Sequence, residues 1–150
     1  METAKNFSRI RSGRDLCISL SLLIVGSILI ALPTSVSINI LGFFMIFTGI
    51  LLIIFMKTGY KDDETGLKYN KEEFFFDKSH LARLAQRIPI KISISDIKDK
   101  DHGNGIRLDI YYNKSVGKSY VQLFKYVPYK YEPYTDMYEH TYDNVSEIIK

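Results

Sequence analysis

The pattern of hydrophobic and polar positions divides this chain after residue 56. Residues 16–56, LCISLSLLIVGSILIALPTSVSINILGFFMIFTGILLIIFM, contain no Lys, Arg, Asp, Glu or His, whereas residues 57–150 contain 31 of the 37 charged residues. The apolar residues of the first segment recur all around a helix, so it lacks the polar face of a helix that packs on a soluble core. The pattern therefore predicts that the two parts of the chain have different surroundings.

Two stretches of the apolar segment are long enough to cross a bilayer. Residues 16–32 and 38–56 are 17 and 19 residues long, and a hydrocarbon core about 30 Å thick needs roughly 17–25 helical residues. Between them lies PTSVS, in which Pro33 cannot continue a hydrogen-bonded helix and the hydroxyl groups suit helix ends in water. We predict a transmembrane helical hairpin over 16–56. A cleaved signal peptide is the alternative, but no small-x-small cleavage site follows and a second span comes directly afterwards.

The flanking charges predict the orientation of this hairpin. Six basic residues flank the spans, four before the first and two after the second: Lys5, Arg9, Arg11, Arg14, Lys57 and Lys61. The intervening loop is uncharged, and cytoplasmic flanks carry an excess of Lys and Arg. We therefore expect a multi-pass protein of the cell's inner (cytoplasmic) membrane with both termini in the cytoplasm. Its parts are a basic N-terminus (1–15), the hairpin, a linker (57–65) and a cytoplasmic β-rich domain (66–150).

Small residues recur at a seven-residue spacing in both spans. Ser19 and Gly26 mark one face of the first helix, and Gly42 and Gly49 mark one face of the second. If the chain folds back at Thr34, Ser19 meets Gly49 and Gly26 meets Gly42, and such small residues let helices approach closely in lipid. Neither span contains an ionisable side chain that would indicate a proton or ion pathway. The hairpin is interpreted as an anchor.

After the linker, the pattern changes to the two-residue period of β-strands. Residues 106–113, IRLDIYYN, and 119–127, SYVQLFKYV, alternate in this way, so each predicts a half-buried strand. The residues expected on their inward faces are Leu108, Ile110, Tyr112, Val121 and Leu123. Turns are expected at DHGNGIR before the first of these strands and at KSVGK between them.

Three other segments carry weaker patterns. Residues 66–78, GLKYNKEEFFFDK, are typical of two short strands around a turn at residues 70–72. SHLARLAQR has helical spacing with Ser79 as a candidate cap. Residues 88–94 alternate isoleucine with other residues, which predicts a further strand.

The C-terminal part is expected to be helical. Pro128 and Pro133 end sheet pairing because proline lacks the ladder donor. Apolar residues from Tyr134 onward fit an amphipathic helix that runs to the C-terminus. Four or five antiparallel strands followed by a helix predict an α+β domain.

Composition argues against several classes of function. A net charge of +3 is too weak to indicate nucleic-acid binding, and the single cysteine, Cys17, rules out an intramolecular disulfide and a cysteine-rich zinc site. Its three histidines, expected on the surface, lack metal-binding spacing. The sequence contains no P-loop, G-x-S-x-G or dinucleotide fingerprint. We therefore predict no enzyme activity, no metal or cofactor, and no nucleic-acid partner, and we identify no small-molecule substrate.

Tyrosine is the one unusual feature of the composition. All eleven tyrosines lie at or after Tyr60, and seven of them are crowded between residues 120 and 142. Tyrosine supplies a large contact area and a polar handle, which suits interfaces. Packing within the domain, binding of a partner and contact with the bilayer interface all remain open. The candidate interface residues are Tyr126, Tyr129, Tyr131, Tyr134 and Tyr138.

Two stretches carry a resemblance to a known family. They are TGLKYNKEEFFFD at residues 65–77 and ISISDIKD at residues 92–99. The chain resembles small bacterial membrane proteins that pair a two-helix hairpin with a cytoplasmic pleckstrin-homology-like (PH-like) domain. That family has a strand, turn and strand at the first stretch and commonly reads Ile-Pro-Trp-x-Asp-Ile at the second, where this chain has Ile94 in place of tryptophan and Ser95 at the variable position.

The resemblance covers residues 15–115 and carries structural expectations only. It implies a partly open β-barrel of about seven strands, plugged by the C-terminal helix, and it implies no catalytic residues. We therefore expect an α+β membrane protein that presents a cytoplasmic PH-like domain to a protein partner or to a second copy of itself. Two other hypotheses remain: a membrane-resident immunity or defence accessory protein, and a lipid-surface sensor that uses the basic N-terminus and the tyrosines.

Overall fold

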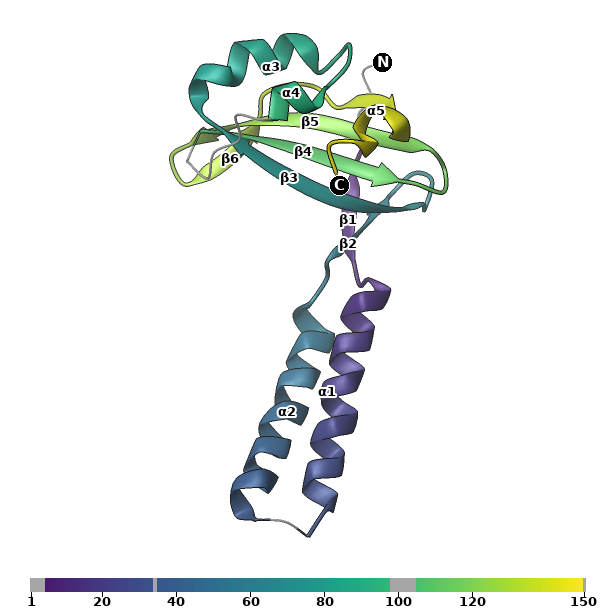
Figure 1. The fold of residues 1–150 in the computed structure, drawn as a ribbon, viewed down its shortest axis with the longest axis vertical. Coiled ribbons are helices and arrows are strands. Elements are labelled where there is room, and N and C mark those ends of the chain that lie inside the picture. The colour runs from purple at the N-terminus through teal and green to yellow at the C-terminus, as the bar shows by residue number, and fades with distance from the viewer. Residues whose placement is uncertain (1–4, 34, 98–104, 150) are drawn as a thin grey trace. The chain divides into compact units, whose positions relative to one another are not determined.

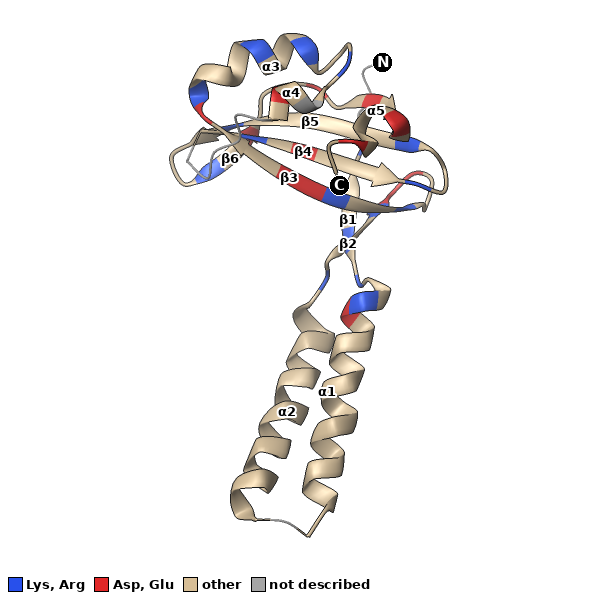
Figure 2. Cartoon of the chain, viewed as in Figure 1, with Lys and Arg blue, Asp and Glu red and all other residues tan. Residues whose placement is uncertain are grey.

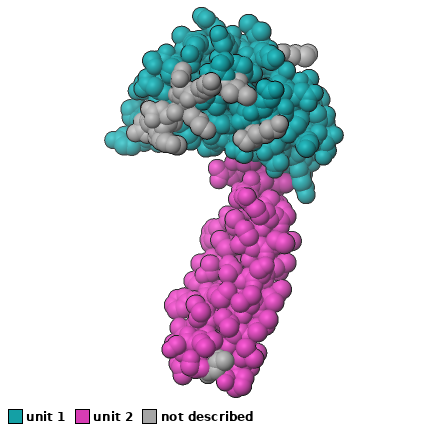
Figure 3. Space-filling view, viewed as in Figure 1, with its two compact units in different colours: residues 1–7, 61–150 teal, residues 8–60 magenta. Residues whose placement is uncertain are grey.

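The computed structural model describes residues 5–33, 35–97 and 105–149 (Figure 1). The chain folds as two compact units (Figure 3). Residues from Ser8 to Tyr60 form the hairpin unit, and the described residues up to Phe7 and from Lys61 onward form the sheet unit. Among the described residues the fold is α+β, with two long apolar helices, seven antiparallel strands and a C-terminal helix.

The elements follow one another in this order: β1 (Phe7–Ile10), α1 (Gly13–Ala31), α2 (Val36–Phe55), β2 (Gly59–Asp62), β3 (Lys68–Phe76), the 3₁₀ turn η1 (Lys78–His80), α3 (Leu81–Arg87), α4 (Ile94–Ile97), β4 (Ile106–Asn113), β5 (Lys118–Val127), β6 (Lys130–Pro133), β7 (Tyr138–Thr141) and α5 (Tyr142–Ser146). The two apolar helices therefore lie close to the spans predicted from the sequence, with α1 beginning three residues earlier.

A network of hydrogen bonds around Asp15 at the start of α1 explains why this helix begins earlier than predicted. The hydroxyl of Ser12 accepts a hydrogen bond from the backbone N–H of Asp15, whose carboxylate accepts one from the backbone N–H of Ser12, which is a capping box. The same carboxylate accepts hydrogen bonds from the backbone N–H and hydroxyl of Thr58 at 2.8 and 2.6 Å. Asp15 thus ties the start of α1 to the chain that follows α2.

In the packing of α1 on α2, small residues lie inside. A Cβ atom added to Gly26 would lie 2.6 Å from the carbonyl oxygen of Gly42, and one added to Gly49 would lie 3.1 Å from the carbonyl oxygen of Ser19. The structure therefore places Gly26 against Gly42 and Ser19 against Gly49, which are the pairs expected from the sequence. Apart from Asp15, these four are the buried residues among those described in the two helices.

The large apolar side chains of the hairpin unit lie outside. Phe43, Phe44 and Phe55 are 65%, 61% and 75% exposed. Only 17% of the most apolar stretch of α1 and 11% of that of α2 is buried, although both helices are long and apolar enough to cross a membrane. Neither helix carries a charged residue after Asp15 (Figure 2). Neither is packed like the core helix of a soluble protein.

The sheet has the strand order β1-β2-β3-β4-β5-β6, and β7 also pairs with β5. Strand β6 pairs with the C-terminal half of β5, from Phe124 to Val127, and β7 pairs with its N-terminal half, from Lys118 to Val121. Both pairings are antiparallel and use the edge of β5 that β4 leaves free. Two short strands therefore share one edge of the longest strand.

One face of the sheet carries the hydrophobic core, which α3, α4 and α5 cover (Figure 1). Leu108, Ile110, Val121 and Leu123 are fully buried there. This confirms the two strands and the inward faces predicted from the alternating pattern. Their partners include Phe76 from β3, Leu84 and Ile88 from the α3 region, and Val145 and Ile148 from the α5 region.

The predicted hairpin around residues 70–72 is wrong, because this segment lies inside the continuous strand β3. Asn70, Lys71 and Glu72 pair with consecutive residues of β4. A tight hairpin favours residues with positive φ at its turn, such as Asn-Gly, and this segment has none. Lys71 is instead held in the sheet by an ion pair of 2.7 Å with Asp109 of β4.

The strand predicted over residues 88–94 is also wrong. Helix α3 ends at Arg87, turns follow, and α4 begins at Ile94. Ile88 and Ile92 are buried while Ile90 is 80% exposed, so a spacing of four decides burial here. The helix over SHLARLAQR is confirmed. The first cap, however, is Asp77, whose carboxylate accepts a hydrogen bond from the backbone N–H of Ser79.

The predicted C-terminal helix is much shorter than expected. Residues 138–141 form β7, and the helix α5 spans only Tyr142–Ser146. Strand β6 was not predicted, although Pro133 does end it. The turn expected at KSVGK is present, whereas most of the turn expected at DHGNGIR lies outside the described residues.

Candidate binding groove at the outer edge of strand β7

Of the six basic residues predicted to set the membrane orientation, Lys5 has the most contacts. Its ammonium group forms ion pairs with Asp62 at 2.6 Å and with Glu64 at 3.2 Å, and it lies 5.5 Å from the ring centre of Tyr120. The hydrogen bond to Asp62 raises the pKa of Lys5 despite the burial that opposes it. Burial would raise the pKa of Asp62, but the hydrogen bonds from Lys5 and Thr65 outweigh it, so that pKa is lowered. Lys5 therefore fixes the N-terminal segment to the sheet unit.

The other orientation residues lie in or near the hairpin unit. Arg9 lies over the ring of Tyr60 at 6.0 Å. Arg11 donates a hydrogen bond to the backbone carbonyl of Ile53 in the last turn of α2, where a cation offsets the helix dipole. The remaining three are exposed: Arg14, Lys57 and Lys61.

The five candidate tyrosines do not form one surface. Tyr126 and Tyr131 contact each other, with ring centres 5.3 Å apart, on the sheet face opposite the core. Tyr138 packs against the core on the other face. Tyr129 is 99% exposed in the β5–β6 turn, with a φ of 71°, and Tyr134 is 49% exposed.

Strand β7 has a hydrogen-bonded inner edge and an unpaired outer edge. The backbone N–H of Tyr142 donates to the carbonyl of Gly117 at 2.8 Å, and this sets the alternation of the β5–β7 ladder. Counting back along it, His140 and Ser119 form a hydrogen-bonded pair and Glu139 forms the next, non-hydrogen-bonded pair. The main chain of Glu139 therefore points away from β5, and no strand in the described part of the chain pairs with that side.

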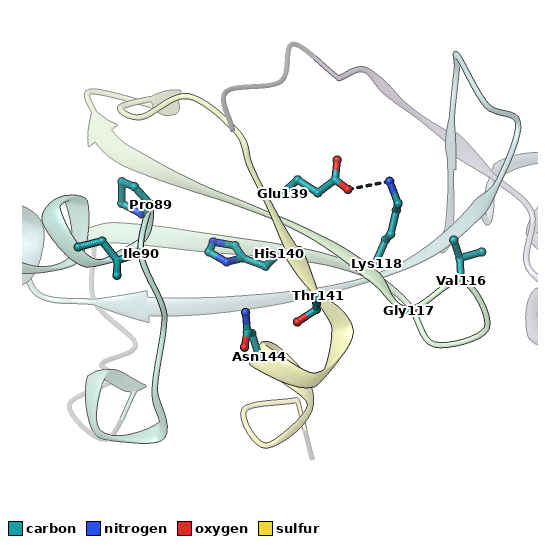
Figure 4. A pocket seen from close by; sticks show the side chains of 9 residues that line it. All are labelled: Pro89, Ile90, Val116, Gly117, Lys118, Glu139, His140, Thr141 and Asn144. Atoms are coloured by element: carbon teal, nitrogen blue, oxygen red, sulfur yellow. Dashed lines mark ion pairs between the residues drawn. The ribbon is translucent and has the colours of Figure 1, made fainter.

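A cavity of about 480 Å³ lies around β7 and reaches this outer edge (Figure 4). The three consecutive β7 residues Glu139, His140 and Thr141 all line it. Ile90, from the segment after α3, lines it on the outer side of β7, and Val116 and Lys118 line it on the side of β5. Successive side chains of a strand point to opposite faces. The cavity therefore extends from one face of β7 to the other and includes main-chain groups of its outer edge, and we call this cavity the β7 groove.

The polar groups of the β7 groove are internally paired. His140 is buried, and its Nε2 lies 2.7 Å from the carbonyl oxygen of Ile88. Burial lowers the pKa of His140, so the ring is neutral at pH 7 and Nε2–H donates to that carbonyl. Lys118 and Glu139 form an ion pair of 2.7 Å, and the hydrogen bond from Lys118 lowers the pKa of Glu139.

Exposed apolar groups lie beside these paired polar groups. Ile90 is 80% exposed and Val116 is 41% exposed, and in Figure 4 they lie on either side of β7. A groove with neutralised charges, apolar walls and free main-chain groups suits a largely neutral ligand with its own main-chain donors and acceptors.

A second cavity of about 480 Å³ lies where the chain passes from β6 to β7. Tyr134, Thr135 and Tyr138 line it together with Gln122 of β5. Here the edge of β5 is already occupied, because the hydroxyl of Thr135 accepts from the backbone N–H of Leu123, and the side-chain amide of Gln122 donates to the carbonyl of Thr135. In this second cavity, the backbone N–H of Leu123 and the side-chain N–H of Gln122 are therefore already hydrogen-bonded within the chain.

A buried ion cluster on the sheet face opposite the core was also missed by the sequence analysis. Asp109 is 1% exposed and lies 2.7 Å from the ammonium of Lys71 and 2.8 Å from Nε of Arg107. Burial raises the pKa of Asp109 against the attraction of these two cations. The guanidinium of Arg107 also lies 4.9 Å from the ring centre of Tyr131. Because its members are paired with one another, we interpret this cluster as structural.

The prediction that the three histidines are surface residues is wrong for His140. His80 is half-buried, and His102 lies outside the described residues. No group of three or more His, Cys, Asp or Glu side chains in the described ranges is placed to hold a metal ion.

Comparisons of the chain with models of known protein families, with curated proteins and with solved structures find no match.

Proposed function

We propose that the protein is a membrane-anchored, non-enzymatic binding protein. In this proposal the hairpin unit spans the inner membrane, and the sheet unit, with a PH-like fold, presents the β7 groove to a partner protein in the cytoplasm. The observation that carries the proposal is the inverted packing of α1 and α2. Their buried positions hold Ser19, Gly26, Gly42 and Gly49, while their large apolar side chains are exposed.

The magnitude of this exposure favours lipid over water. Nineteen large apolar side chains in the described residues between Leu16 and Phe55 are exposed. Moving each partly exposed side chain out of water is favourable by roughly 1 kcal/mol, or about 20 kcal/mol together. That exceeds the stability of about 5–15 kcal/mol of a typical domain. In a bilayer the same side chains contact acyl chains, and the close approach at the glycines holds the helices together.

Contacts on the sheet unit support a hairpin that crosses the bilayer twice. Lys5, which precedes α1, pairs with Asp62, which follows α2. Phe7 stacks on Tyr111 with ring centres 4.3 Å apart and an interplanar angle of 3°. Segments from both ends of the hairpin thus belong to one fold, which requires them to lie on the same side of the membrane. The basic flanks favour the cytoplasmic side.

The experiment is cysteine labelling of the full chain in intact cells, in a Cys17→Ser background that has no other thiol. We expect a membrane-impermeant maleimide to label Ser35→Cys in intact cells and Ser115→Cys only after permeabilisation. Equal labelling of both positions before permeabilisation would contradict the proposed sidedness. Recovery of the chain from a high-speed supernatant without detergent would contradict the anchor itself.

A second candidate function, a lipid-surface sensor, is favoured by Tyr129. This side chain is 99% exposed in a turn flanked by the exposed Lys125 and Lys130, and tyrosine with lysine suits the headgroup region. The chain contains no tryptophan, so Tyr129→Trp is a single fluorescent reporter. A sensor would show quenching by brominated anionic lipid that is lost in high salt, whereas unquenched emission would exclude this role for Tyr129.

A further inference from the structure

We infer that the β7 groove receives an extended peptide segment of a partner protein, which adds as a strand to the outer edge of β7. This inference rests on the proposed function and specifies how the partner is recognised. Main-chain hydrogen bonds to β7 give the segment its register, and an apolar side chain of the segment lies against Ile90.

The main chain of β7 supplies the first argument. Glu139 and Thr141 both belong to non-hydrogen-bonded pairs with β5, so the N–H groups of both and the carbonyl of Glu139 point outward. These three groups have no hydrogen-bond partner among the described residues, whereas the carbonyl of Thr141 accepts from the hydroxyl of Ser119 at 3.2 Å. Residues two apart in a strand repeat at about 6.8 Å. The ligand whose donors and acceptors repeat at that distance is another strand, as in β-strand addition.

The walls of the groove supply the second argument. Ile90 is the most exposed large aliphatic side chain described in the sheet unit, and Val116 is also exposed. The segment that carries Ile90 is held in place because Ile88 is fully buried and its carbonyl accepts the hydrogen bond from His140. Pro89 has no N–H to compete for the ligand's carbonyls. The groove is therefore preorganised, which reduces the entropy lost on binding.

The charges of the groove and the sheet topology narrow the choice of ligand. Lys118 and Glu139 neutralise each other, so an ionic small molecule gains no unpaired charge there. The neighbouring edge of β5 is closed by Thr135, which bonds to Leu123 through its hydroxyl and its backbone N–H. Along this side of the sheet, another strand can therefore be added at the outer edges of β6 and β7, and the cavity lies at β7. A peptide fits these conditions better than a charged metabolite.

Thr141→Pro is the variant that separates the edge from the fold. Thr141 has a φ of −71°, which a proline ring accommodates, and the preceding His140 is extended, as a residue before proline prefers. The substitution removes an outward N–H that makes no internal hydrogen bond, so the sheet unit keeps its own pairing. Thr141→Val is the matched control, because it removes the hydroxyl and keeps the N–H.

The readout is the alkylation rate of Ile90→Cys in the full chain, with Cys17 replaced by serine. The rate is compared between membranes of cells that naturally make the protein, opened to admit a maleimide, and the purified chain in nanodiscs of synthetic lipid. A partner present at about ten times its dissociation constant slows alkylation in the cell membranes about tenfold. We expect Thr141→Pro to restore the fast rate and Thr141→Val to leave it slow.

Three results would overturn the inference. Equal rates in cell membranes and nanodiscs would mean that nothing occupies the groove. Slow alkylation that survives Thr141→Pro would mean that the occupant does not use the edge of β7. If alkylation in nanodiscs becomes slower as the protein density rises, the groove is occupied by a second copy of the chain. In each case the labelling of Ser35→Cys and Ser115→Cys still reports separately on the membrane anchor.

Discussion

In the hairpin unit glycine and serine occupy the helix–helix contact and phenylalanine lies outside, whereas in the sheet unit Phe76 and Ile110 are fully buried. The two units thus place large apolar side chains in opposite positions. In water, apolar surface is driven into the interior. In lipid that driving force is absent between helices, and close packing through small residues holds them together. The contrast shows that the kind of residue a unit buries reports the solvent around it.

The largest expected effect concerns the interior of the sheet unit. Phe76→Ala removes a fully buried ring from the core and should lower the free energy of unfolding by about 4 kcal/mol. The measurement is urea unfolding of the full chain in detergent, followed by near-ultraviolet circular dichroism of the tyrosines. Far-ultraviolet helicity from α1 and α2 should persist after this transition. A loss below about 1 kcal/mol would contradict the assignment of Phe76 to the core.

The hairpin unit should respond to the opposite substitution. A Cβ on Gly42 would lie 2.8 Å from the carbonyl oxygen of Gly26, so Gly42→Leu should separate the helices and weaken their association by about 2–3 kcal/mol. The matched control is Ile40→Leu, at a position that is 52% exposed. Thermal unfolding in detergent should shift strongly for the first variant and little for the second. Similar shifts for both would refute the packing through small residues.

The sequence predicts the hairpin unit well, because its packing depends on local spacing. The seven-residue repeat of small residues placed Gly26 opposite Gly42, and the structure shows that contact. Strands β4 and β5 were predicted for the same reason, since alternation alone marks their inward faces. The start of α1 was missed although Ser12 and Asp15 have the spacing of a capping box, because the prediction followed the uncharged run that begins at Leu16.

The failures of prediction involve residues whose partners are distant in sequence. Residues 138–141 fit a helical spacing, and only pairing with β5 makes them a strand. His140 is buried against the carbonyl of Ile88, which is 52 residues away, and no local sequence pattern predicts that contact. The β7 groove could not be predicted, because it exists only once β5, β7 and the segment after α3 are assembled.

The exposed tip of the sheet unit offers a smaller effect of opposite sign. Tyr129 has a φ of 71°, a left-handed conformation that is unfavourable for a residue with a Cβ and open to glycine. Tyr129→Gly should therefore stabilise the sheet unit by up to about 1 kcal/mol, as measured by the urea midpoint. Tyr129→Ala keeps the strained conformation and should not stabilise. If both variants lower the midpoint, Tyr129 has packing contacts that its exposure does not indicate.

The smallest effect is a pH dependence within the sheet unit. Burial lowers the pKa of His140 below its usual value of 6.5, so the unfolded chain binds this proton at higher pH than the folded chain. The stability that depends on neutral His140 is therefore present above pH 6.5 and is lost as the pH falls toward the folded pKa. Urea midpoints should fall on mild acidification, and His140→Gln should reduce that fall. His80→Gln is the control, and an unchanged slope in His140→Gln would contradict the assignment.

The most direct test of the central claim is whether lipid surrounds the outward face of α2. Phe47 is 52% exposed near the middle of that helix, and because the chain has no tryptophan, Phe47→Trp creates a single reporter. In nanodiscs, we predict blue-shifted emission that is quenched strongly by lipids brominated deep in their acyl chains and weakly by acrylamide in the water. Red-shifted emission that acrylamide quenches and brominated lipid does not would contradict the account.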